Sequence, residues 1–337
     1  MMDVLDSARE LHALPTDLLT GQELRELARL EGLRARDGMA THYAVDVTGG
    51  RLTGLLPVYP TPTELLPPTR ISGLFGEPGP TDWSVAALLG SDTSGPSLFR
   101  FRRNETARAL LALAQTVVDD YGPDLYCLPL LDDGQYEVTA ARRPADFAGE
   151  RHDAHVSVPC GSFDDYVMAL PRQRRVQVRR ERRAFLSSGL VVEDRAVTGS
   201  LGLARLLYQV ERRHGAPSSV AWERDYLRGV GAAMAGAGTA LVASLAGRPV
   251  ATTVLWDVGS HWRIRCWGCD YAVPEVRDSY AYFNLMFYEP ISRAAAAGVS
   301  RLAVGTGSLE GKRRRGAVTR RLRSVGWSGQ LGGGQRM

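Results

Sequence analysis

The chain has 337 residues, of which 44% are hydrophobic and 23% are charged, the composition of an ordinary folded protein. This composition excludes wholesale disorder, collagen-like repeats and a small disulfide-stapled protein, and no apolar run approaches the roughly 18 residues of a membrane-spanning helix. The first residues include acids and lack an apolar segment. We therefore expect a cytoplasmic protein with no signal peptide and no integral membrane association.

The net charge of +4 conceals an asymmetry between the two halves of the chain. Residues 1–150 carry 13 arginines against 22 acids, whereas residues 151–337 carry 28 basic residues against 15 acids. Halves of opposite charge indicate two units with different partners, the second of which faces an anion. Lys312 is the only lysine, since every other basic residue is an arginine.

The hydrophobic pattern of the first half predicts helices and strands in a definite order. The predicted elements are a helix over residues 17–35, a hairpin over 42–60, a helix over 104–122 and a buried strand over 125–131. A Pro/Gly-rich stretch from Pro57 to Pro80 is typical of loops.

The second half repeats this order. The predicted elements are a helix over 200–215, a helix over 220–236 capped by Ser219, strands over 240–247, 248–258 and 261–271, a helix over 279–297 kinked at Pro290, and a strand over 301–305. The two hairpins also have weakly similar sequences, GGRLTGLLPV from Gly49 and AGRPVATTVL from Ala246. We therefore predict a mixed α/β (α+β) fold of two similar units, residues 1–155 and 156–337, each a mostly antiparallel sheet flanked by helices.

Two cysteines, Cys266 and Cys269, have the spacing of a redox pair or of half a zinc site. Their flanking residues alternate as a strand, which points the two side chains to opposite faces. No second pair of this spacing completes a zinc site. We interpret both as buried structural cysteines and expect no bound metal.

The first of two basic segments covers residues 171–185. It is predicted to be a helix that begins at Pro171, after a short helix capped by Ser162 and Asp165. Four of its arginines fall three or four residues apart and form one cationic stripe, Arg172, Arg175, Arg179 and Arg183. Guanidinium groups bind phosphate bidentately, so the stripe is a candidate phosphate site. The alternative is a solvated face that the acidic first half balances.

The second basic segment, residues 301–324, looks like a phosphate-binding P-loop but departs from the pattern twice. Thr306 stands where the first glycine is required, and Arg313 stands where Ser or Thr is required, which excludes an ATPase. A Gly-rich turn after a strand still exposes backbone N–H groups, and positive charge surrounds it. We predict an anion or oxyanion site here, with a disordered basic tail as the alternative. Its residues are Gly305, Gly307, Lys312, Arg313, Arg314 and Arg315.

Residues from about 162 to 326 resemble the FemAB-like branch of the GNAT acyltransferase superfamily, the peptidoglycan bridge transferases and their relatives. Three segments carry the resemblance. A short helix precedes the Arg-rich helix at 162–183, an aromatic helix runs into an Ala-rich turn at 282–298, and a closing strand leads to Lys312 and, four residues later, Gly316. The resemblance therefore implies that the two predicted units are tandem GNAT-like units, with the first on the acceptor side.

Members of the group that this chain resembles transfer an aminoacyl group from charged tRNA to an amine, without a metal or a covalent enzyme intermediate. The resemblance implies that Lys312 holds the aminoacyl ester and its developing oxyanion, and that the arginines hold phosphates of tRNA or substrate. Aminolysis of an ester needs a cation near the tetrahedral oxygen, which agrees with this role.

The aromatic helix supplies further candidates. Tyr282 and Asn284 are candidates for substrate binding, and Tyr288 and Glu289 for orienting or deprotonating the amine. The alternative for Tyr288 is packing in the core, as we expect for Phe283 and Phe287.

Three functions remain open from the sequence. The first is an aminoacyltransferase that uses charged tRNA as co-substrate, needs no cofactor, and acts on a small or nucleotide-linked amine in cell-wall or antibiotic assembly. The second is an acyl-CoA-dependent N-acyltransferase, although both halves lack the R/Q-x-x-G-x-G/A pyrophosphate loop of ordinary GNAT enzymes. The third is a non-catalytic RNA-binding protein.

Overall fold

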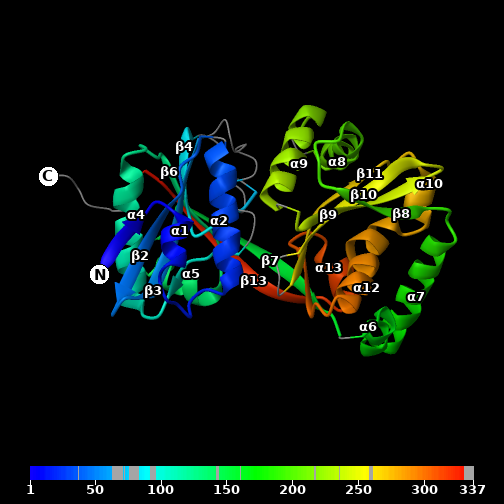
Figure 1. Cartoon of the computed structure of the whole chain (residues 1–337), viewed down its shortest axis with the longest axis horizontal. Helices are drawn as coiled ribbons and strands as arrows, with labels where there is room; N and C mark the ends of the chain where they lie inside the picture. The colour runs from blue at the N-terminus through cyan, green and yellow to red at the C-terminus, as the bar shows by residue number, and fades with distance from the viewer. Residues whose placement is uncertain are drawn as a thin grey trace. The chain divides into compact units, whose positions relative to one another are not determined.

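The computed structural model describes residues 1–36, 38–62, 71, 73–75, 83–91, 96–141, 144–159, 161–215, 218–234, 236–257 and 261–329. The chain divides into two compact units (Figure 1). The first consists of Met1–Arg151 and Arg321–Met337, and the second of His152–Arg320.

The first unit is a mixed sheet with the strand order β1-β2-β3-β4-β6-β13, and β5 pairs with β3. The only parallel pair among these described strands is β4 with β6. The strands are β1 Met2–Leu5, β2 His42–Thr48, β3 Arg51–Pro62, β4 Val85–Leu89, β5 Arg100–Phe101, β6 Leu125–Leu131 and β13 Val318–Ser328. The helices are α1 Ala8–His12, α2 Gly21–Arg36, α4 Asn104–Asp119 and α5 Asp133–Ala140.

Helices cover both faces of this sheet (Figure 1). On one face, Leu11 of α1 and Leu27 of α2 pack in a cluster with Tyr43 of β2. On the other, Leu110 of α4 packs in a cluster with Leu56 of β3. Strands buried on both faces account for the continuous apolar runs in this half of the sequence.

The second unit has the strand order β7-β12-β11-β10-β9-β8. The only parallel pair among these described strands is β11 with β12. The strands are β7 Phe147–Ser157, β8 Val191–Ala196, β9 Gly238–Leu245, β10 Arg248–Asp257, β11 Trp262–Cys269 and β12 Arg301–Gly305. The helices are α6 Phe163–Ala169, α7 Arg172–Leu186, α8 Leu201–Arg213, α9 Val220–Met234, α10 Pro274–Asp278, α11 Ala281–Phe283, the π-helix η1 Asn284–Tyr288, α12 Glu289–Ala296 and α13 Leu309–Arg313.

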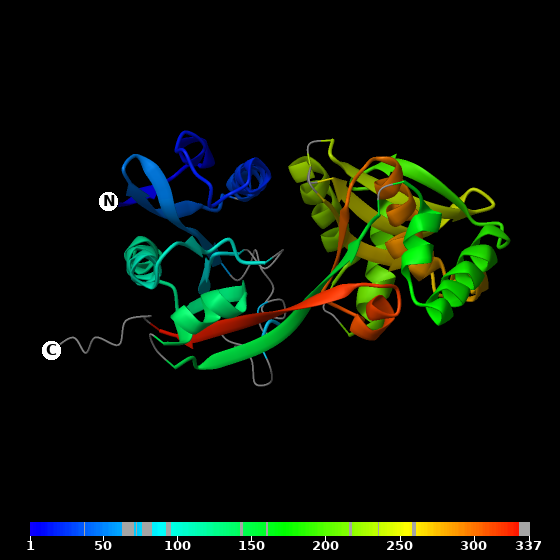
Figure 2. The same cartoon turned by 90° about the horizontal axis from the view of Figure 1, so that it is seen from below.

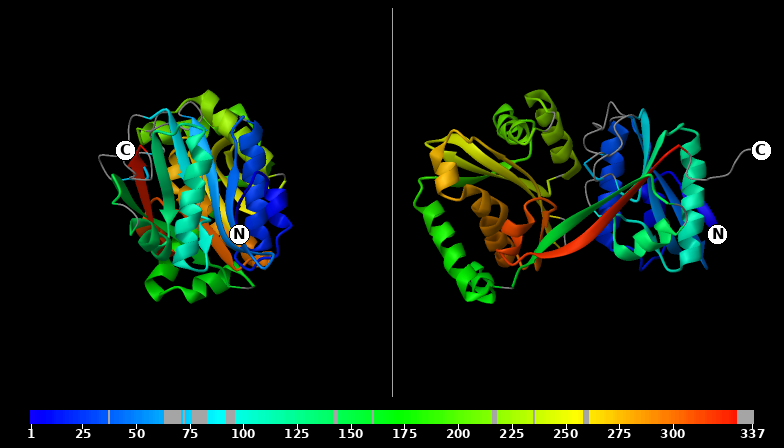
Figure 3. Two further views of the ribbon diagram at one scale, coloured as in Figure 1. Left: turned by 90° about the vertical axis from the view of Figure 1, so that its left-hand side faces the viewer. Right: turned by 180° about the vertical axis from the view of Figure 1, so that it is seen from behind.

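Helices also cover both faces of the second sheet (Figure 3, right panel). On one face, Leu203 of α8 and Leu227 of α9 pack against Val254 of β10. Helix α8 comes so close that a Cβ added at Gly268 of β11 would lie 2.7 Å from the backbone nitrogen of Leu207. On the other face, η1 and α12 pack against the sheet, and α6 and α7 join the same cluster.

The predicted fold class, two tandem units with mostly antiparallel sheets flanked by helices, is confirmed. Each unit contains an antiparallel meander, a helical segment, a strand parallel to the last meander strand, and a short helix. The two hairpins with weakly similar sequences turn at equivalent places. Gly49 and Gly50 have φ of 59° and 73°, and Ala246 and Gly247 have φ of 48° and 77°. Positive φ at both central residues is typical of the type I′ hairpin turn.

Two long strands, β7 and β13, each pass from one unit to the other (Figure 2). Strand β7 begins in the first unit, but its residues Ala154–Ser157 pair with β12 of the second. Strand β13 begins in the second unit, but its residues Arg323–Ser328 pair with β6 of the first, where Val325 and Trp327 are buried. The sequence predicted that residues 156–337 form one unit. Because β13 crosses to the first unit, the residues from Arg321 onward belong to that unit instead.

The aromatic helix differs from its prediction. Instead of one helix kinked at Pro290, the chain forms the five-residue π-helix η1, and Pro290 lies in the first turn of α12. The N–H of Glu289 donates to the carbonyl of Asn284, five residues earlier. Proline has no N–H to donate, so a widened turn before it costs no additional hydrogen bond.

The predicted caps are confirmed. The hydroxyl of Ser219 accepts from the N–H of Trp222 at 3.1 Å at the start of α9, and the hydroxyl of Ser162 accepts from the N–H of Asp165 at 3.2 Å in α6. Among the helices in the described part of the chain, none is both long enough and apolar enough to cross a lipid bilayer.

Candidate functional site

The parallel strands β11 and β12 stay together only at their start. Trp262 pairs with Leu302 and Arg263 with Ala303, and the described residues show no further pair, although β11 continues to Cys269. The carboxyl ends of these two strands therefore separate. Crevices at the carboxyl ends of parallel strands are common ligand sites in α/β proteins.

Lys312 of α13 lies against the end of β12. Its side chain is buried, with 3% of the residue exposed, and its Nζ donates to the carbonyl oxygens of Val304 at 2.5 Å and Gly305 at 2.8 Å. Burial lowers the pKa of Lys312 to about 8, although the carboxylate of Asp153 opposes this shift. An ammonium group has three donors, so one N–H remains for a ligand.

The predicted loop Gly305–Ser308 joins β12 to α13. Gly305 has a φ of +71°, which favours glycine, whereas no atom lies within 4 Å of a Cβ added at Gly307. The Tyr282 hydroxyl is hydrogen-bonded to Ser308, and its ring meets Trp267 of β11 edge-on with centroids 5.3 Å apart. Tyr282 thus lies beside this loop, together with Lys312.

A buried ion pair joins α7 to the segment after α13. The guanidinium of Arg315 donates to both carboxylate oxygens of Glu181 at 2.7 and 2.6 Å, and these residues are only 2% and 1% exposed. Arg315 also donates to the Tyr288 hydroxyl at 2.9 Å and to the carbonyl of Gly311 at 2.7 Å. The Arg315 guanidinium is buried and paired with a carboxylate, and this arrangement does not support the predicted direct contact of Arg315 with phosphate.

Two predicted site residues on the aromatic helix belong to the same buried network. The Tyr288 hydroxyl donates to Glu181, and burial raises the pKa of Tyr288 above its usual range. The amide of Asn284 donates to the backbone carbonyls of Glu181, Ser279 and Tyr280. Neither side chain is exposed, which does not support the predicted contacts of Tyr288 and Asn284 with substrate. Both residues instead position Glu181.

The third predicted residue of this helix, Glu289, lies at the edge of the network. Its carboxylate accepts from Arg182 at 2.8 Å and from Arg293 at 3.1 Å. Two guanidinium groups thus pair with this one carboxylate. The structure therefore gives Glu289 a structural ion pair on each side, and its predicted role toward the amine stays a prediction.

The arginine stripe lies on the predicted helix, now α7. Arg172, Arg179 and Arg183 are exposed and Arg175 is half-buried. Arg175 donates to the carbonyl of Leu170 at 2.7 Å, and Arg175 and Arg179 contact the sulfur of Met168. In the described part of the chain these four guanidinium groups form no ion pair with a carboxylate. They form a cationic surface, which we call the α7 arginine face.

The remaining predicted arginines differ from one another. Arg313 is exposed and donates to the Thr319 hydroxyl at 3.3 Å, whereas Arg314 is exposed and paired with Glu310 at 2.7 Å. The predicted cluster of three consecutive phosphate-binding arginines is thus divided. Of the three, Arg313 is the one that this structure leaves exposed without a carboxylate partner among the described residues.

The connection from β11 to α10 is acidic. Asp270 accepts from the backbone N–H of Ala272 at 3.0 Å and lies 3.4 Å from Arg248, and Glu275 and Asp278 follow in α10. Asp270 and Asp278 are paired with arginines, Arg248 and Arg277, whereas Glu275 forms no ion pair among the described residues.

The cysteine pair is structural. Cys266 and Cys269 pack in different core clusters, and burial raises their pKa values to about 12 and about 11, so both remain thiols at neutral pH. The described residues contain no group of three or more His, Cys, Asp or Glu side chains arranged to hold a metal.

Glu181 and its neighbour Arg182 were not predicted from the sequence. A signal was present, because Val178, Glu181 and Phe185 lie three and four residues apart and all three are buried. A single acid on the apolar side of an Arg-rich helix has to be neutralised inside the protein.

Comparisons with known proteins agree with this architecture. Residues 172–313 match the family model of the acetyltransferase (GNAT) domain. FemX has a similar structure, with 10% identity, a TM-score of 0.61 and coverage of 95% of this chain and 96% of FemX. A tandem GNAT protein from the clavulanic acid biosynthesis pathway shows 13% identity and a TM-score of 0.56, over 99% of this chain and 100% of that protein.

A third similar structure is the C-terminal domain of a protein from Agrobacterium fabrum described as a putative lysylphosphatidylglycerol synthetase. It has 12% identity and a TM-score of 0.51, over 96% of this chain and 93% of that domain. None of the curated proteins matches the sequence. The predicted resemblance to the FemAB-like branch of the GNAT superfamily is confirmed at the level of the fold, and the GNAT domain supports an acyltransferase.

Replacing Glu181 with Gln leaves the buried Arg315 without a counter-ion. We expect the free energy of unfolding to fall by about 3–5 kcal/mol, measured by urea denaturation. Glu310→Gln, which breaks the exposed pair with Arg314, is the matched control and is expected to leave the free energy of unfolding nearly unchanged. Equal effects of the two substitutions would contradict the assignment of a buried, stabilising pair.

Because Lys312 is the only lysine, its side chain gives a single NMR signal in protein labelled at the lysine Cε. We expect a titration midpoint of about 8, against 10.5 in the unfolded chain. Between these values the unfolded chain binds more protons, so stability rises with pH there, by about 3 kcal/mol at most. The rise is expected to vanish in Lys312→Met. A midpoint near 10.5 in the folded protein would show that Lys312 is solvated.

Proposed function

We propose that this protein transfers an aminoacyl group from charged tRNA to the amine of a small or nucleotide-linked acceptor. The observation that carries the proposal is the α7 arginine face, four guanidinium groups without carboxylate partners among the described residues of the GNAT domain. Clustered arginines repel one another unless an anion lies among them. A polyanion such as tRNA supplies phosphates along the whole face.

The proposed reaction is the aminolysis of an ester. The acceptor amine attacks the ester carbonyl of the aminoacyl-tRNA, a C–N bond forms, and the carbonyl oxygen becomes an oxyanion. Collapse of this tetrahedral species breaks the bond between the carbonyl carbon and the ribose oxygen. The proton lost by the amine ends on that ribose oxygen, so donor and acceptor together balance the reaction.

Lys312 has the properties that this reaction requires. Its ammonium lies at the end of β12, where β11 has already separated, and two of its three donors are fixed on backbone carbonyls. The third is available to the oxyanion, and a charge in a desolvated site stabilises it more than a charge in water does. Because its bonds to Val304 and Gly305 fix its place, little reorganisation accompanies the reaction.

The missing pyrophosphate loop favours tRNA over acyl-CoA as donor. An acyl-CoA enzyme of ordinary GNAT type binds a pyrophosphate with a Gly-rich basic loop, and this chain lacks that loop.

The names of the similar structures support this substrate class. The lysylphosphatidylglycerol synthetase is named for a product that carries a lysyl group, and FemX shares the overall fold. The clavulanic acid pathway of the tandem GNAT protein supports an acceptor in specialised-metabolite assembly. Charged tRNA is a cytoplasmic substrate, so the proposal places the reaction in the cytoplasm.

An acyl-CoA-dependent N-acyltransferase is the second candidate, and the match of residues 172–313 to the acetyltransferase (GNAT) domain favours it. Desulfo-CoA distinguishes the two. It competes with the donor in an acyl-CoA enzyme and leaves transfer from tRNA unaffected.

The direct test uses total tRNA charged with labelled amino acids and a small-molecule extract of the host. We expect label to move into an RNase-resistant, alkali-stable product, which is the behaviour of an amide. Lys312→Met keeps the side-chain volume without the charge, and we expect it to lower turnover at least about a hundredfold while tRNA binding stays within about threefold. Circular dichroism checks that the variant folds.

Two outcomes of this test would contradict the proposal. Label that stays on tRNA with several extracts, together with transfer from acyl-CoA, would assign the second candidate. Tight tRNA binding without transfer from either donor would assign a non-catalytic RNA-binding protein.

The α7 arginine face has its own prediction. We expect replacement of Arg179 and Arg183 by Gln to weaken tRNA binding and to reduce the slope of log affinity against log salt by about 0.7–0.9 for each phosphate that the variant no longer binds. Arg228→Gln is the control, because Arg228 lies on α9 and is paired with Asp225 at 2.8 Å. An unchanged salt slope in the double variant would exclude the α7 arginine face from tRNA binding.

A further inference from the structure

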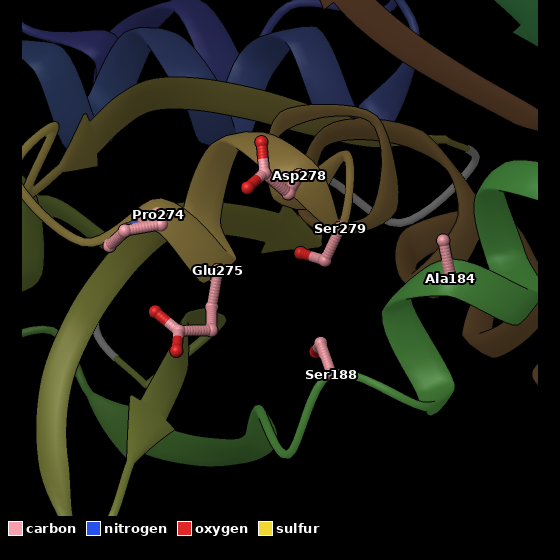
Figure 4. A pocket seen from close by; sticks show the side chains of 6 residues that line it. All are labelled: Ala184, Ser188, Pro274, Glu275, Asp278 and Ser279. Atoms are coloured by element: carbon pink, nitrogen blue, oxygen red, sulfur yellow. The ribbon is translucent and has the colours of Figure 1, made fainter.

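A pocket of about 270 Å³ lies in the second unit between the end of α7 and the start of the helical segment after β11 (Figure 4). Ala184 and Ser188 line it from the α7 side, and Pro274, Glu275, Asp278 and Ser279 line it from the other. None of these residues belongs to the α7 arginine face or to the loop and helix that carry Lys312. The pocket is therefore separate from the site proposed above.

Ser279 carries a buried hydroxyl without a hydrogen-bond partner. Only 2% of the residue is exposed, and its Oγ has no partner among the described atoms. The backbone groups of Ser279 are both satisfied, because its N–H donates to the carbonyl of Glu275 at 3.1 Å and its carbonyl accepts from Asn284 at 3.4 Å. Figure 4 shows the Ser279 oxygen directed into the space between Glu275 and Ser188. Buried hydroxyls are normally paired, so this one points to a ligand.

The charge around the pocket is negative, although the second half of the chain is basic. The carboxylate of Glu275 is half-buried and forms no hydrogen bond or ion pair in the described part of the chain. Asp278 is exposed and paired with Arg277 at 2.7 Å, so Glu275 is the carboxylate available to a ligand. Among the described residues, no basic side chain lines the pocket.

The end of α7 adds partial charge of the same sign. Helix α7 has 15 residues, and its last turn, with Ala184, borders the pocket. The carbonyl end of a helix of this length favours a cation. The Ser188 hydroxyl is satisfied within the chain, because it donates to the carbonyl of Phe185 at 2.7 Å and accepts from the N–H of Leu190 at 3.2 Å.

We propose that this pocket binds a small organic ammonium ion. The ammonium donates to the carboxylate of Glu275 and to the hydroxyl oxygen of Ser279, and the alkyl part of the ligand contacts Ala184 and Pro274. Since water occupies about 30 Å³ in the liquid, the volume holds the equivalent of about nine waters. That is sufficient for an ammonium group with a short carbon chain.

The test measures binding of n-butylammonium to the full chain by amide chemical shifts and by calorimetry. We expect saturable shifts at Glu275 and Ser279, a dissociation constant at least about tenfold lower than that of n-butanol, and no competition by potassium ions. Glu275→Gln is expected to weaken binding at least about tenfold, and Ser279→Ala at least about threefold. Glu310→Gln, which removes an exposed carboxylate from α13, is the matched control and is expected to bind normally.

Several results would overturn the proposal. Equal affinity for n-butanol would show an apolar cavity, and equal competition by potassium would show a site for inorganic cations. Normal binding by Glu275→Gln, with circular dichroism equal to that of the parent protein, would exclude the pocket as the site. These results are independent of tRNA-dependent transfer, because neither variant alters the α7 arginine face or Lys312.

Discussion

The buried ion pair between Glu181 and Arg315 is the interaction on which the candidate site depends. Removing two charges from water costs several kcal/mol each, and only a fully satisfied pair offsets this cost. Here Glu181 accepts from Arg315, Tyr288 and Gln177. The pair fixes α7 to the segment after α13. It thereby holds the α7 arginine face and Lys312, which are far apart in the sequence, in a single arrangement.

The π-helix explains how two residues of one helical segment both form hydrogen bonds with Glu181. Asn284 and Tyr288 are the first and last residues of η1, and both are fully buried. The amide of Asn284 binds the backbone carbonyl of Glu181, and the hydroxyl of Tyr288 binds its carboxylate. Widened helical turns are frequent at functional sites because they reorient side chains that a regular α-helix would point elsewhere.

Local sequence patterns predicted the local structure well, since the caps at Ser162 and Ser219, the twin hairpin turns and the helix from Arg172 all depend on near neighbours. They could not predict the exchange of β7 and β13, because strand pairing across almost 200 residues leaves no periodic signal. The same limit applies to the site. Lys312 and the arginine stripe are visible in the sequence, whereas the burial of Arg315, Tyr288 and Asn284 depends on a partner, Glu181, more than 100 residues away.

The ion pairs of the second unit also explain why its excess charge is displayed on α7. Inside the unit, Glu181 neutralises Arg315, and Glu289 and Asp194 together pair with Arg182 and Arg293. These acids are placed where a guanidinium is buried or half-buried and an unpaired charge would cost most. The outer arginines of α7 receive no such partner in the described residues, so their mutual repulsion persists until an anion binds. The interior arginines are thus paired with acids, whereas the α7 arginine face is left to gain binding energy from a polyanion. In the proposed reaction, the charge of the buried Lys312 remains available to the ester.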